Sequence, residues 1–558
     1  MKNNNSISNF KDAPSKSKKI LTTSALPYVN GLQHLGHLAG NNLPTDLYSR
    51  FLRQKGYEVL SVCGADMHGA AIEIGAEKEG LSVLDYSEKY FKKIISVYKK
   101  FNISYDIFSK TSIKENFELT QEIAKRLLEN GFLVEKTIEM FFSKVDNRFL
   151  MDRLIEGVCP FCDFSNARGD QCDKCGELLT PQELKNPFSK ISGDKNLELK
   201  KTRHLFLQLG KLKPKLEEWL ANKRWDNTTA GIVKKWMKVE LKDRCITRDL
   251  EWGVPVPFPN FENKVFYVWF DAPIAYLAMT KKLCLDRNID PNEWIKDNNS
   301  TMWTQFMGKD NIVFHSIIFP AILLGADQNW KLVDTIKGLN FLNFEGEKFS
   351  KSNNVGIYLE DAIKLYQSDM LRYYLIINSP ETADFNFKVE LFKDTINKDL
   401  NNTLGNFVSR VTKFTAKYFD DNVPVPCQFT QEDVSFFDNI QSILDDYHRN
   451  MFSLNIKKSA ENVRSLWIQG NKFITDNEPW KIVKNDRERT ATILFICFQL
   501  IDLFRRTMKP LIPDTADKLS KMTPDLKLDD VIPDRFDLAV LPKGEKFSII
   551  DNLFEKLE

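Results

Sequence analysis

The chain has 558 residues, of which 42% are hydrophobic and 28% charged, with a formal net charge of +2. The length predicts several globular domains, because single hydrophobic cores stop growing at about 250–300 residues. The longest apolar runs, such as residues 317–324, are too short to cross a bilayer, so we expect no membrane contact. The balanced charge excludes a uniformly basic nucleic-acid binder, and any such site must be a local patch.

The N-terminal segment and the cysteines indicate the cellular setting. Residues 1–18 are rich in Asn, Ser and Lys and lack Arg, which predicts a disordered tail rather than an import signal. The nine cysteines form no even disulfide framework, because four are clustered and the others are scattered. This pattern favours a reducing, cytoplasmic location.

A strand–turn–helix unit opens the folded part of the chain. Residues 20–23 predict a strand, and a loop then leads to a helix that begins at His34-Leu35-Gly36-His37 and ends at Gly56. Unpaired N–H groups and the dipole make such a helix start a polyphosphate site. His34 and His37 lie on one face and can donate to phosphate oxygens, and Gly36 leaves room for a purine. Alone, the quartet is also compatible with an ordinary helix start.

The following residues continue a β–α rhythm. Residues 59–63 predict a second strand and residues 82–101 an amphipathic helix. We therefore expect a parallel, helix-covered sheet with ligands at the carboxyl ends of its strands. Asp66 lies at such an end beside Gly64 and Gly69, where a carboxylate can bind a substrate ammonium group, although Asp is also common in plain loops.

A cysteine cluster marks what we predict to be an irregular insertion at residues 130–245. It contains two C-x-x-C pairs separated by nine residues, namely Cys159 with Cys162 and Cys172 with Cys175. Four thiolates presented by two tight turns make a closed, tetrahedral zinc site, and a closed site is structural rather than catalytic. Two disulfides or idle thiols are the alternatives.

The second half of the chain divides into a sheet region and a helical region. Strand patterns return at residues 265–270 and 312–314, and residues 348–352 read Lys-Phe-Ser-Lys-Ser in a polar, Gly-flanked segment. Lys348 and Lys351 on a closing loop suit the charge that develops on a departing pyrophosphate. Beyond residue 389, amphipathic helices broken by prolines predict an all-α bundle. Residues 547–554 are compatible with a final helix that folds back.

Residues 34–37 and 348–352 together resemble the two signatures of class I aminoacyl-tRNA synthetases. Residues 25–31, 64–69 and 267–273 sharpen the resemblance to the methionyl enzymes, and it extends from about residue 19 to about residue 518. It implies an α/β fold: a Rossmann-like parallel-sheet catalytic domain with a zinc-knuckle insertion, followed by an all-α anticodon-binding bundle.

The resemblance and the patterns together predict the following organisation. The expected parts are a tail (1–18), the first half of the catalytic domain (19–120), the insertion (121–245), the second half of the catalytic domain (246–339), the lysine-loop and stem-contact region (340–388), the anticodon-binding domain (389–540) and a C-terminal segment that can dock back (541–558).

The resemblance also implies site residues. For methionine they are Leu26, Tyr28, Asp66, Trp269, Ala272, Pro273, Tyr276 and His315, with Tyr28 and His315 approaching the sulfur. For ATP and catalysis they are His34, Gly36, His37, Gly308, Asp310, Lys348, Ser350 and Lys351, and for the anticodon Asn406, Arg410 and Trp480. Without the resemblance, each aromatic residue is equally compatible with plain core. Arg248 matches a position used in activation, or it forms a surface salt bridge.

The implied reaction is ATP-dependent formation of methionyl adenylate, followed by transfer to tRNA(Met), including initiator tRNA. One structural Zn²⁺ is expected, because residues 187–192, where similar enzymes often carry a second knuckle, offer serines; Mg²⁺ is expected with ATP. We expect a monomer, because the chain does not reach a C-terminal dimerising domain. The alternatives are a non-catalytic tRNA-binding paralogue, a small-molecule adenylyltransferase, or a synthetase for leucine, valine, isoleucine or cysteine.

Overall fold

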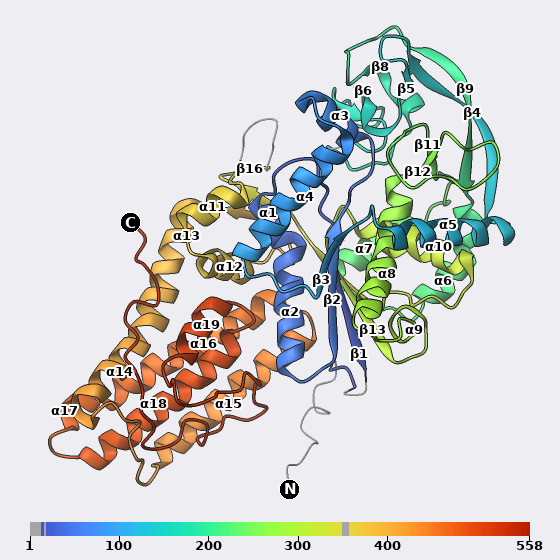
Figure 1. Ribbon diagram of the computed structural model, residues 1–558. Helices are drawn as coiled ribbons and strands as arrows, with labels where there is room; N and C mark the ends of the chain where they lie inside the picture. Colours follow the sequence, from blue (N-terminus) through green and yellow to red (C-terminus); the bar gives the residue numbers. More distant parts are fainter. Residues whose placement is uncertain (1–12, 16–17, 173, 349–355) are drawn as a thin grey trace.

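The structure, a computed structural model, describes residues 13–15, 18–172, 174–348 and 356–558. Figure 1 shows a helical domain at one end, a parallel sheet with its helices in the middle, and an insertion at the other end. The α/β class predicted from the sequence, with an insertion and a C-terminal helical domain, is confirmed.

A five-stranded parallel sheet forms the centre of the molecule. Its strands, in spatial order, are β14 (Thr335–Leu339), β13 (Thr301–Gly308), β1 (Lys19–Ser24), β2 (Val59–Ala65) and β3 (Ile107–Lys110). The strand order reverses between β1 and β13, and ligands of open α/β sheets bind at the carboxyl ends beside such a reversal. The loop before His34 and the residue Gly308 both lie at these ends.

Helices cover both faces of the sheet, as expected for parallel strands that are buried on both sides. One face packs against α2 (Leu43–Gln54) and α4 (Val83–Lys100), and the other against α5 (Lys114–Glu129), α8 (Val268–Asp286) and α10 (Phe319–Ala326). The predicted second strand and amphipathic helix are confirmed as β2 and α4. Two shorter helices of this part are α3 (Ala70–Glu79) and α9 (Asn292–Ile295).

The insertion is more regular than its sequence predicted. Its elements are β4 (Leu133–Ser143), β5 (Arg148–Phe149), η3 (Asp152–Leu154), β6 (Ile155–Val158), β7 (Ala167–Arg168), η4 (Pro181–Glu183), β8 (Lys185–Ser189), β9 (Glu198–Leu207), α6 (Leu209–Leu220), α7 (Asn227–Met237) and β10 (Arg244–Cys245). The long pair β4–β9 is antiparallel and carries charges on its exposed face, where Arg203 pairs with Glu135 at 3.0 Å. Because these charged residues interrupt the apolar pattern, the sequence did not indicate the two strands.

Short elements complete the sheet domain and lead out of it. β11 (Thr247–Arg248) and β12 (Val265–Phe266) precede α8, and η5 (Phe314–Ile318) precedes α10. The sheet is joined to the helical domain by β15 (Leu342–Phe344), β16 (Glu347–Lys348), α11 (Leu359–Leu365), α12 (Ser368–Ile377) and β17 (Phe385–Phe387). The helical domain then contains α13 (Val389–Thr395), η6 (Ile396–Gly405), α14 (Asn406–Phe419), α15 (Gln431–Phe452), α16 (Ile456–Asn477), α17 (Pro479–Ile482), α18 (Arg487–Met508) and α19 (Pro513–Ser520).

The helical domain shares a core with the sheet domain. Phe51 of α2 packs edge-on against Tyr447 and Phe452 of α15, with ring centroids 5.8 and 5.0 Å apart. Arg372 of α12 is buried and donates to Asp46 Oδ2 of α2 at 2.7 Å and to the carbonyl of Leu511 at 3.0 Å. The two domains therefore meet through packed and hydrogen-bonded side chains rather than through a linker.

The ends of the chain differ from expectation in part. The expected disordered tail lies mostly outside the described residues, but Tyr57 Oη donates to the Pro14 carbonyl at 2.7 Å, so residues 13–15 contact the sheet domain. The expected helix at residues 547–554 is wrong: the segment has no regular secondary structure and packs onto the helical domain, where the Ser548 N–H donates to the Met522 carbonyl at 2.7 Å. Buried Phe547 and Phe554 hold it there without helical hydrogen bonds.

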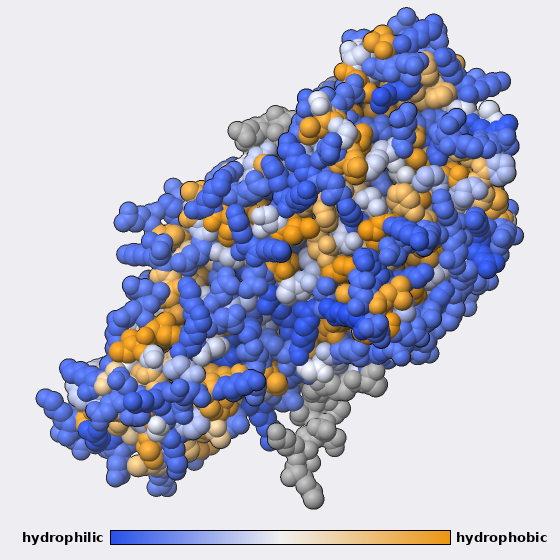
Figure 2. Space-filling model, viewed as in Figure 1, coloured by the Kyte–Doolittle hydropathy of each residue, from blue (hydrophilic) through white to orange (hydrophobic). Residues whose placement is uncertain are grey.

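The surface view completes this description. The face in Figure 2 is mostly hydrophilic, with hydrophobic residues in small groups. Within the part of the chain that the structure describes, every helix is too short or too polar to span a lipid bilayer.

Candidate active site and metal centre

The histidine quartet begins a continuous helix at the carboxyl end of β1. His34 is the N-cap of α1 (Leu35–His37), which continues through η2 (Leu38–Asn42) into α2. The Gly36 N–H donates to His34 Nδ1 at 3.1 Å, and the His34 N–H donates to His37 Nδ1 at 3.2 Å. The two imidazole centroids are 3.8 Å apart.

These bonds correct the expectation that unpaired backbone N–H groups bind polyphosphate. The N–H groups of His34 and Gly36 are already used by the two imidazoles, and the Leu35 N–H faces the Ile357 carbonyl at 3.4 Å. In the neutral imidazoles, a Nδ1 that accepts a hydrogen bond leaves the proton on Nε2. The donors that this helix start offers to an anion are therefore imidazole N–H groups.

The segment after the lysine loop is bound to the same helix start. Tyr358 forms an isolated antiparallel bridge with His34, and the Leu359 N–H donates to the Gln33 carbonyl at 2.9 Å. Before the loop, Lys348 ends strand β16, which pairs with β15. Ser350 and Lys351 lie outside the described residues. The segment that follows the lysine signature, more than 300 residues after the histidine quartet in the sequence, thus lies against the same edge of the sheet.

Gly308 and Asp310 lie beside this helix start, at the end of β13. A Cβ on Gly308 would come within 2.7 Å of Asp310 Oδ1, so the carboxyl group of Asp310 needs glycine at that position. Burial raises the pKa of Asp310. Between them, Lys309 reaches outward and pairs with Asp384 at 2.7 Å.

Tyr28 and Asp66 form one side of the candidate amino-acid pocket. The Val29 N–H donates to the Asp66 carbonyl at 3.2 Å, and the Asp66 N–H donates to the Pro27 carbonyl at 2.9 Å. Gly69 has φ +99°, and a Cβ there would lie 2.8 Å from Tyr28 Oη, so both backbone and space require glycine. Leu26 lies in the same loop after β1 and is partly buried.

The carboxyl group of Asp66 lies in a buried, acidic setting. Its residue is 7% exposed. Burial, followed by the neighbouring Asp271, raises the pKa of Asp66 well above its ordinary value. Asp271 itself is completely buried and pairs with His68 Nδ1 at 2.8 Å. Burial and Asp271 thus favour the protonated form of Asp66, whereas a cation beside it would favour the carboxylate.

The remaining pocket candidates lie on α8 and η5. Tyr276 is buried in α8, and its hydroxyl donates to His315 Nε2 at 3.0 Å. His315 Nδ1 donates to the Asn311 carbonyl at 2.9 Å, and burial lowers the pKa of His315 to about 4. The imidazole is thus neutral with a defined tautomer, and both of its nitrogens are engaged. Ala272 and Pro273 are buried one turn before Tyr276.

Trp269 has a partner that the sequence did not single out. Its ring lies 3.9 Å from that of Phe314, centroid to centroid. Both rings line a cavity of about 510 Å³ between the insertion and α8, which Tyr28, Asp66, Tyr276 and His315 do not line. The sequence predicted Phe314 as part of a strand at residues 312–314, which is wrong, because Phe314 begins the helical element η5.

Arg248 forms a buried ion pair, which corrects the alternative of a surface salt bridge. Its Nε and Nη2 donate to Asp152 Oδ2 and Oδ1 at 2.6 and 2.9 Å, and its guanidinium lies 3.8 Å from the centre of the Tyr267 ring. Asp152 holds the pKa of Arg248 above its ordinary value despite burial. Arg248 therefore joins the insertion to the start of α8 in a permanently charged form.

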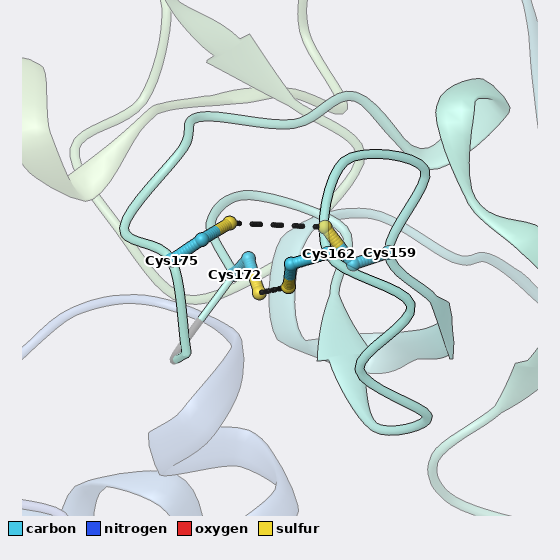
Figure 3. A group of neighbouring side chains, drawn as sticks. All are labelled: Cys159, Cys162, Cys172 and Cys175. Carbon is cyan, nitrogen blue, oxygen red and sulfur yellow. Dashed lines mark hydrogen bonds between the residues drawn. The ribbon is translucent and has the colours of Figure 1, made fainter.

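The four clustered cysteines converge as expected, and Figure 3 shows their sulfur atoms directed toward one another. The Cys159–Cys175 and Cys162–Cys172 sulfur pairs are 3.9 and 3.6 Å apart. A tetrahedron of thiolates with bonds of about 2.3 Å has sulfurs about 3.8 Å apart, whereas a disulfide needs about 2.05 Å. The residues present therefore fit a tetrahedral zinc ion, and the disulfide alternative fails.

A second pair of turns resembles the pair that carries the cysteines, but it has hydroxyl and carboxyl groups in place of thiols. Gly193 and Gly176 both have φ +76°, and each N–H donates to the carbonyl four residues earlier, that of Ser189 at 3.0 Å and that of Cys172 at 2.9 Å. Ser189 and Ser192 each donate to Asp146 Oδ2, at 2.6 and 3.0 Å. Hydrogen bonds close this second turn pair, as thiolates and a metal would close the first.

The candidate anticodon residues lie together at the far end of the helical domain. Arg410 lies over the Trp480 ring, with its guanidinium carbon 5.0 Å from the ring centroid. Trp480 is 41% exposed at the start of α17. It is therefore not a buried core residue, which the sequence without the resemblance also allowed. Asn406 is exposed one turn before Arg410 on α14, on the same helix face.

Comparisons with known proteins agree with this arrangement. Residues 20–412 match the family model described as tRNA synthetases class I (M), and residues 423–558 match the anticodon binding domain of methionyl tRNA ligase. The chain is 42% identical to Methionine–tRNA ligase 1 of Acaryochloris marina, covering 97% of each chain, and 40% identical to Methionine–tRNA ligase of Streptomyces avermitilis, covering 96% of each.

A solved structure is similar in fold. Mycobacterium tuberculosis methionyl-tRNA synthetase in complex with methionyl-adenylate superposes with a TM-score of 0.78 over 96% of this chain and 99% of that chain. The two sequences are 23% identical. The likeness extends across the sheet domain, the insertion and the helical domain.

Proposed function

The chain belongs to the class I methionyl-tRNA synthetases, and we propose which of its residues carry out the reaction of that family. The reaction is that of a methionine–tRNA ligase: L-methionine is activated by ATP to methionyl adenylate, and the methionyl group is then transferred to the 3′ end of tRNA. The observation that carries the proposal is the pairing of residues 357–359 with the helix start at His34, beside Gly308.

ATP is proposed to bind at this edge of the sheet. His34 and His37 would donate to its phosphates, Gly36 would lie under the adenine, and Asp310, packed on Gly308, would accept from the ribose hydroxyls. Lys348, Ser350 and Lys351 would approach the β- and γ-phosphates when the loop closes. Mg²⁺, carried by the phosphates, would offset part of their negative charge.

Methionine is proposed to bind between Asp66 and the α8 residues. The carboxylate of Asp66 would anchor the ammonium group, and Leu26, Ala272 and Pro273 would shape the apolar walls. The sulfur would meet aromatic edges of Tyr28, Tyr276 and His315, which suit a polarizable thioether. Trp269 would contribute from the cavity between the insertion and α8 that it lines with Phe314. Because both nitrogens of His315 are engaged, its contact with sulfur would be made by ring atoms rather than by an N–H donor.

The two chemical steps need no covalent nucleophile from the protein. The methionine carboxylate attacks the α-phosphorus of ATP, and pyrophosphate leaves. A terminal ribose hydroxyl of tRNA then attacks the methionyl carbonyl carbon, and AMP leaves. Catalysis is by positioning and by cations that stabilise the charge on the leaving pyrophosphate. We assign that role to the imidazoles of His34 and His37 and to Lys348 and Lys351.

The wider setting is proposed as follows. Asn406, Arg410 and Trp480 would read the unstacked bases of the anticodon of tRNA(Met), including the initiator tRNA. One zinc ion would be held by the cysteine cluster, where it stabilises the insertion. The nine cysteines, all of which lie in the described residues, form no disulfide bond, and this supports a cytoplasmic location.

The proposal is tested by ATP–pyrophosphate exchange with each of the twenty amino acids. Exchange that depends on methionine alone is the expected result. Exchange driven best by leucine, valine, isoleucine or cysteine would contradict the pocket assignment. Absence of exchange with all twenty, from protein that is folded and contains zinc, would indicate the non-catalytic tRNA-binding alternative.

A further inference from the structure

The helix that leads to Trp480 receives its N-terminal cap from another part of the chain. α16 has Asn455 at its N-cap position, but that side chain makes no capping hydrogen bond. Instead, the N–H groups of Ile456 and Lys457 donate to Glu381 Oε1 and Oε2 at 3.1 and 2.8 Å. A carboxylate there satisfies two orphan donors and complements the helix dipole.

The same carboxylate also binds the catalytic sheet. Lys337 Nζ of β14 lies 2.6 Å from Glu381 Oε1, and both side chains are almost buried, at 8% and 13% exposure. β14 pairs directly with β13, whose last residue is Gly308. One buried group therefore joins the anticodon-side helix to the strand next to the candidate ATP site.

The loop that carries Glu381 makes further contacts with the same site. Asp384 Oδ1 accepts from Lys309 Nζ at 2.7 Å and from the Phe341 N–H at 2.9 Å. Directly after it, β17 pairs with β15, and β15 pairs with β16, which ends at Lys348. A shift of this loop would therefore reach both Lys309 and the base of the lysine loop.

At its other end, α16 reaches the candidate anticodon residues. It has 22 residues, which corresponds to about 33 Å, and Trp480 follows three residues after its end. In the middle, Arg464 pairs with Asp399 of η6 at 2.9 Å, and η6 continues into the helix that carries Asn406 and Arg410. α16, which leads to Trp480, and η6, which leads to Asn406 and Arg410, are thus joined to each other, and α16 is joined to the Glu381 contact.

We infer that Glu381 is a positioning residue that couples anticodon binding to the ATP site. The inference rests on the proposed function of Trp480 and Arg410. A base bound at the far end of α16 would shift or stiffen the helix, and the Glu381 carboxylate would pass that change to β14 and to the loop that holds Lys309. Glu381 touches no substrate; it acts through Lys337, Asp384 and the strands.

Glu381→Gln is the informative change, because it keeps the shape but removes the charge. The amide offers one acceptor oxygen where the carboxylate offers two, so it cannot hold both α16 N–H groups and Lys337. Glu461→Gln is the matched control, since Glu461 is an exposed residue on the same helix. Thermal unfolding of both variants shows whether either fails to fold.

The first measurement compares a full-length tRNA(Met) with an acceptor-stem minihelix that lacks the anticodon. We expect Glu381→Gln to lower kcat for the full-length tRNA roughly tenfold, within the 5–150-fold range of typical site-to-site coupling. KM for that tRNA, minihelix charging and methionine-dependent pyrophosphate exchange should stay near wild type. A parallel fall in minihelix charging and exchange would mean a structural role and would overturn the inference, as would an unchanged kcat.

The second measurement tests the coupling in binding affinity rather than in rate. A non-hydrolysable methionyl-adenylate analogue should tighten the binding of tRNA to the wild type by at least about fivefold, and this gain should disappear in Glu381→Gln. An equal gain in the variant, or no gain in the wild type, would refute the coupling. Failure of the proposed function is distinguishable, because it would appear in the wild type as absent exchange, or in Trp480→Ala as unchanged use of tRNA.

Discussion

Replacing Asp66 by Asn removes one negative charge from the candidate methionine pocket and keeps the shape of the side chain. Because Asp66 is 7% exposed, bulk water cannot replace the lost partner of the ammonium group. A hydrogen bond between charged groups contributes about 1.5–3 kcal/mol, and 1.4 kcal/mol corresponds to a factor of ten. The KM for methionine should therefore rise roughly 10–150-fold, while kcat changes less.

The pH dependence gives this prediction a second signature. Burial and Asp271 raise the pKa of Asp66 in the empty pocket, and only its ionised form can pair with the ammonium group. Binding of methionine therefore releases a proton, so affinity increases with pH up to the raised pKa and is level above it. Below that pKa, KM should rise about tenfold for each unit of falling pH, and Asp66→Asn should lack this dependence.

Methionine-dependent pyrophosphate exchange across a pH series measures both quantities. Asp286→Asn is the matched control, because Asp286 lies on α8 with 55% of its side chain exposed, and its KM and pH profile should match the wild type. An unchanged KM in Asp66→Asn would refute Asp66 as the anchor. A pH dependence that persists in the variant would assign the titration to another group.

Four further changes test the other assignments. Lys351→Ala should lower kcat of adenylate formation roughly 10²–10³-fold with little change in methionine affinity, measured by pre-steady-state kinetics; equal losses in both would assign Lys351 to ground-state binding. Elemental analysis should find about one zinc per chain, and Cys162→Ser should lower that content; two zinc ions would contradict the oxygen-lined second turn pair. Asp146→Ala should leave zinc unchanged but make the insertion more sensitive to proteolysis, because Ser189 and Ser192 lose their common acceptor. Trp480→Ala should weaken aminoacylation of tRNA roughly tenfold or more and leave exchange and thermal stability near wild type; a parallel loss of stability would make Trp480 structural.

Short-range patterns in the sequence determined the parts of this protein that depend on neighbouring residues. The strand before His34, the helix at residues 82–101 and the cysteine spacing all involve groups within one or two turns of each other, and the structure confirms them. Two ligands three residues apart come from the same tight turn in any fold that keeps that turn. The resemblance of residues 34–37 and 348–352 to a known family then identified the chemistry without any coordinates.

Other local expectations failed because neighbours in space competed with neighbours in sequence. The N–H groups at the helix start were expected to face a ligand, but the imidazoles of His34 and His37 take two of them. The apolar spacing of residues 547–554 allowed a helix, but Phe547 and Phe554 are buried against the helical domain and the Ser548 N–H donates to the Met522 carbonyl instead. In both cases a partner close in space took a hydrogen bond that the sequence pattern assigned elsewhere.

Only the tertiary structure decided the ionisation and the partners of the site residues. The raised pKa of Asp66 depends first on its burial and then on Asp271, more than 200 positions away in the chain. The tautomer of His315 depends on Tyr276 and Asn311. The cap of α16 comes from Glu381, 75 residues before Ile456. No local pattern encodes such pairs, because a charge or a hydrogen bond depends on distance and burial in space, and the fold sets both.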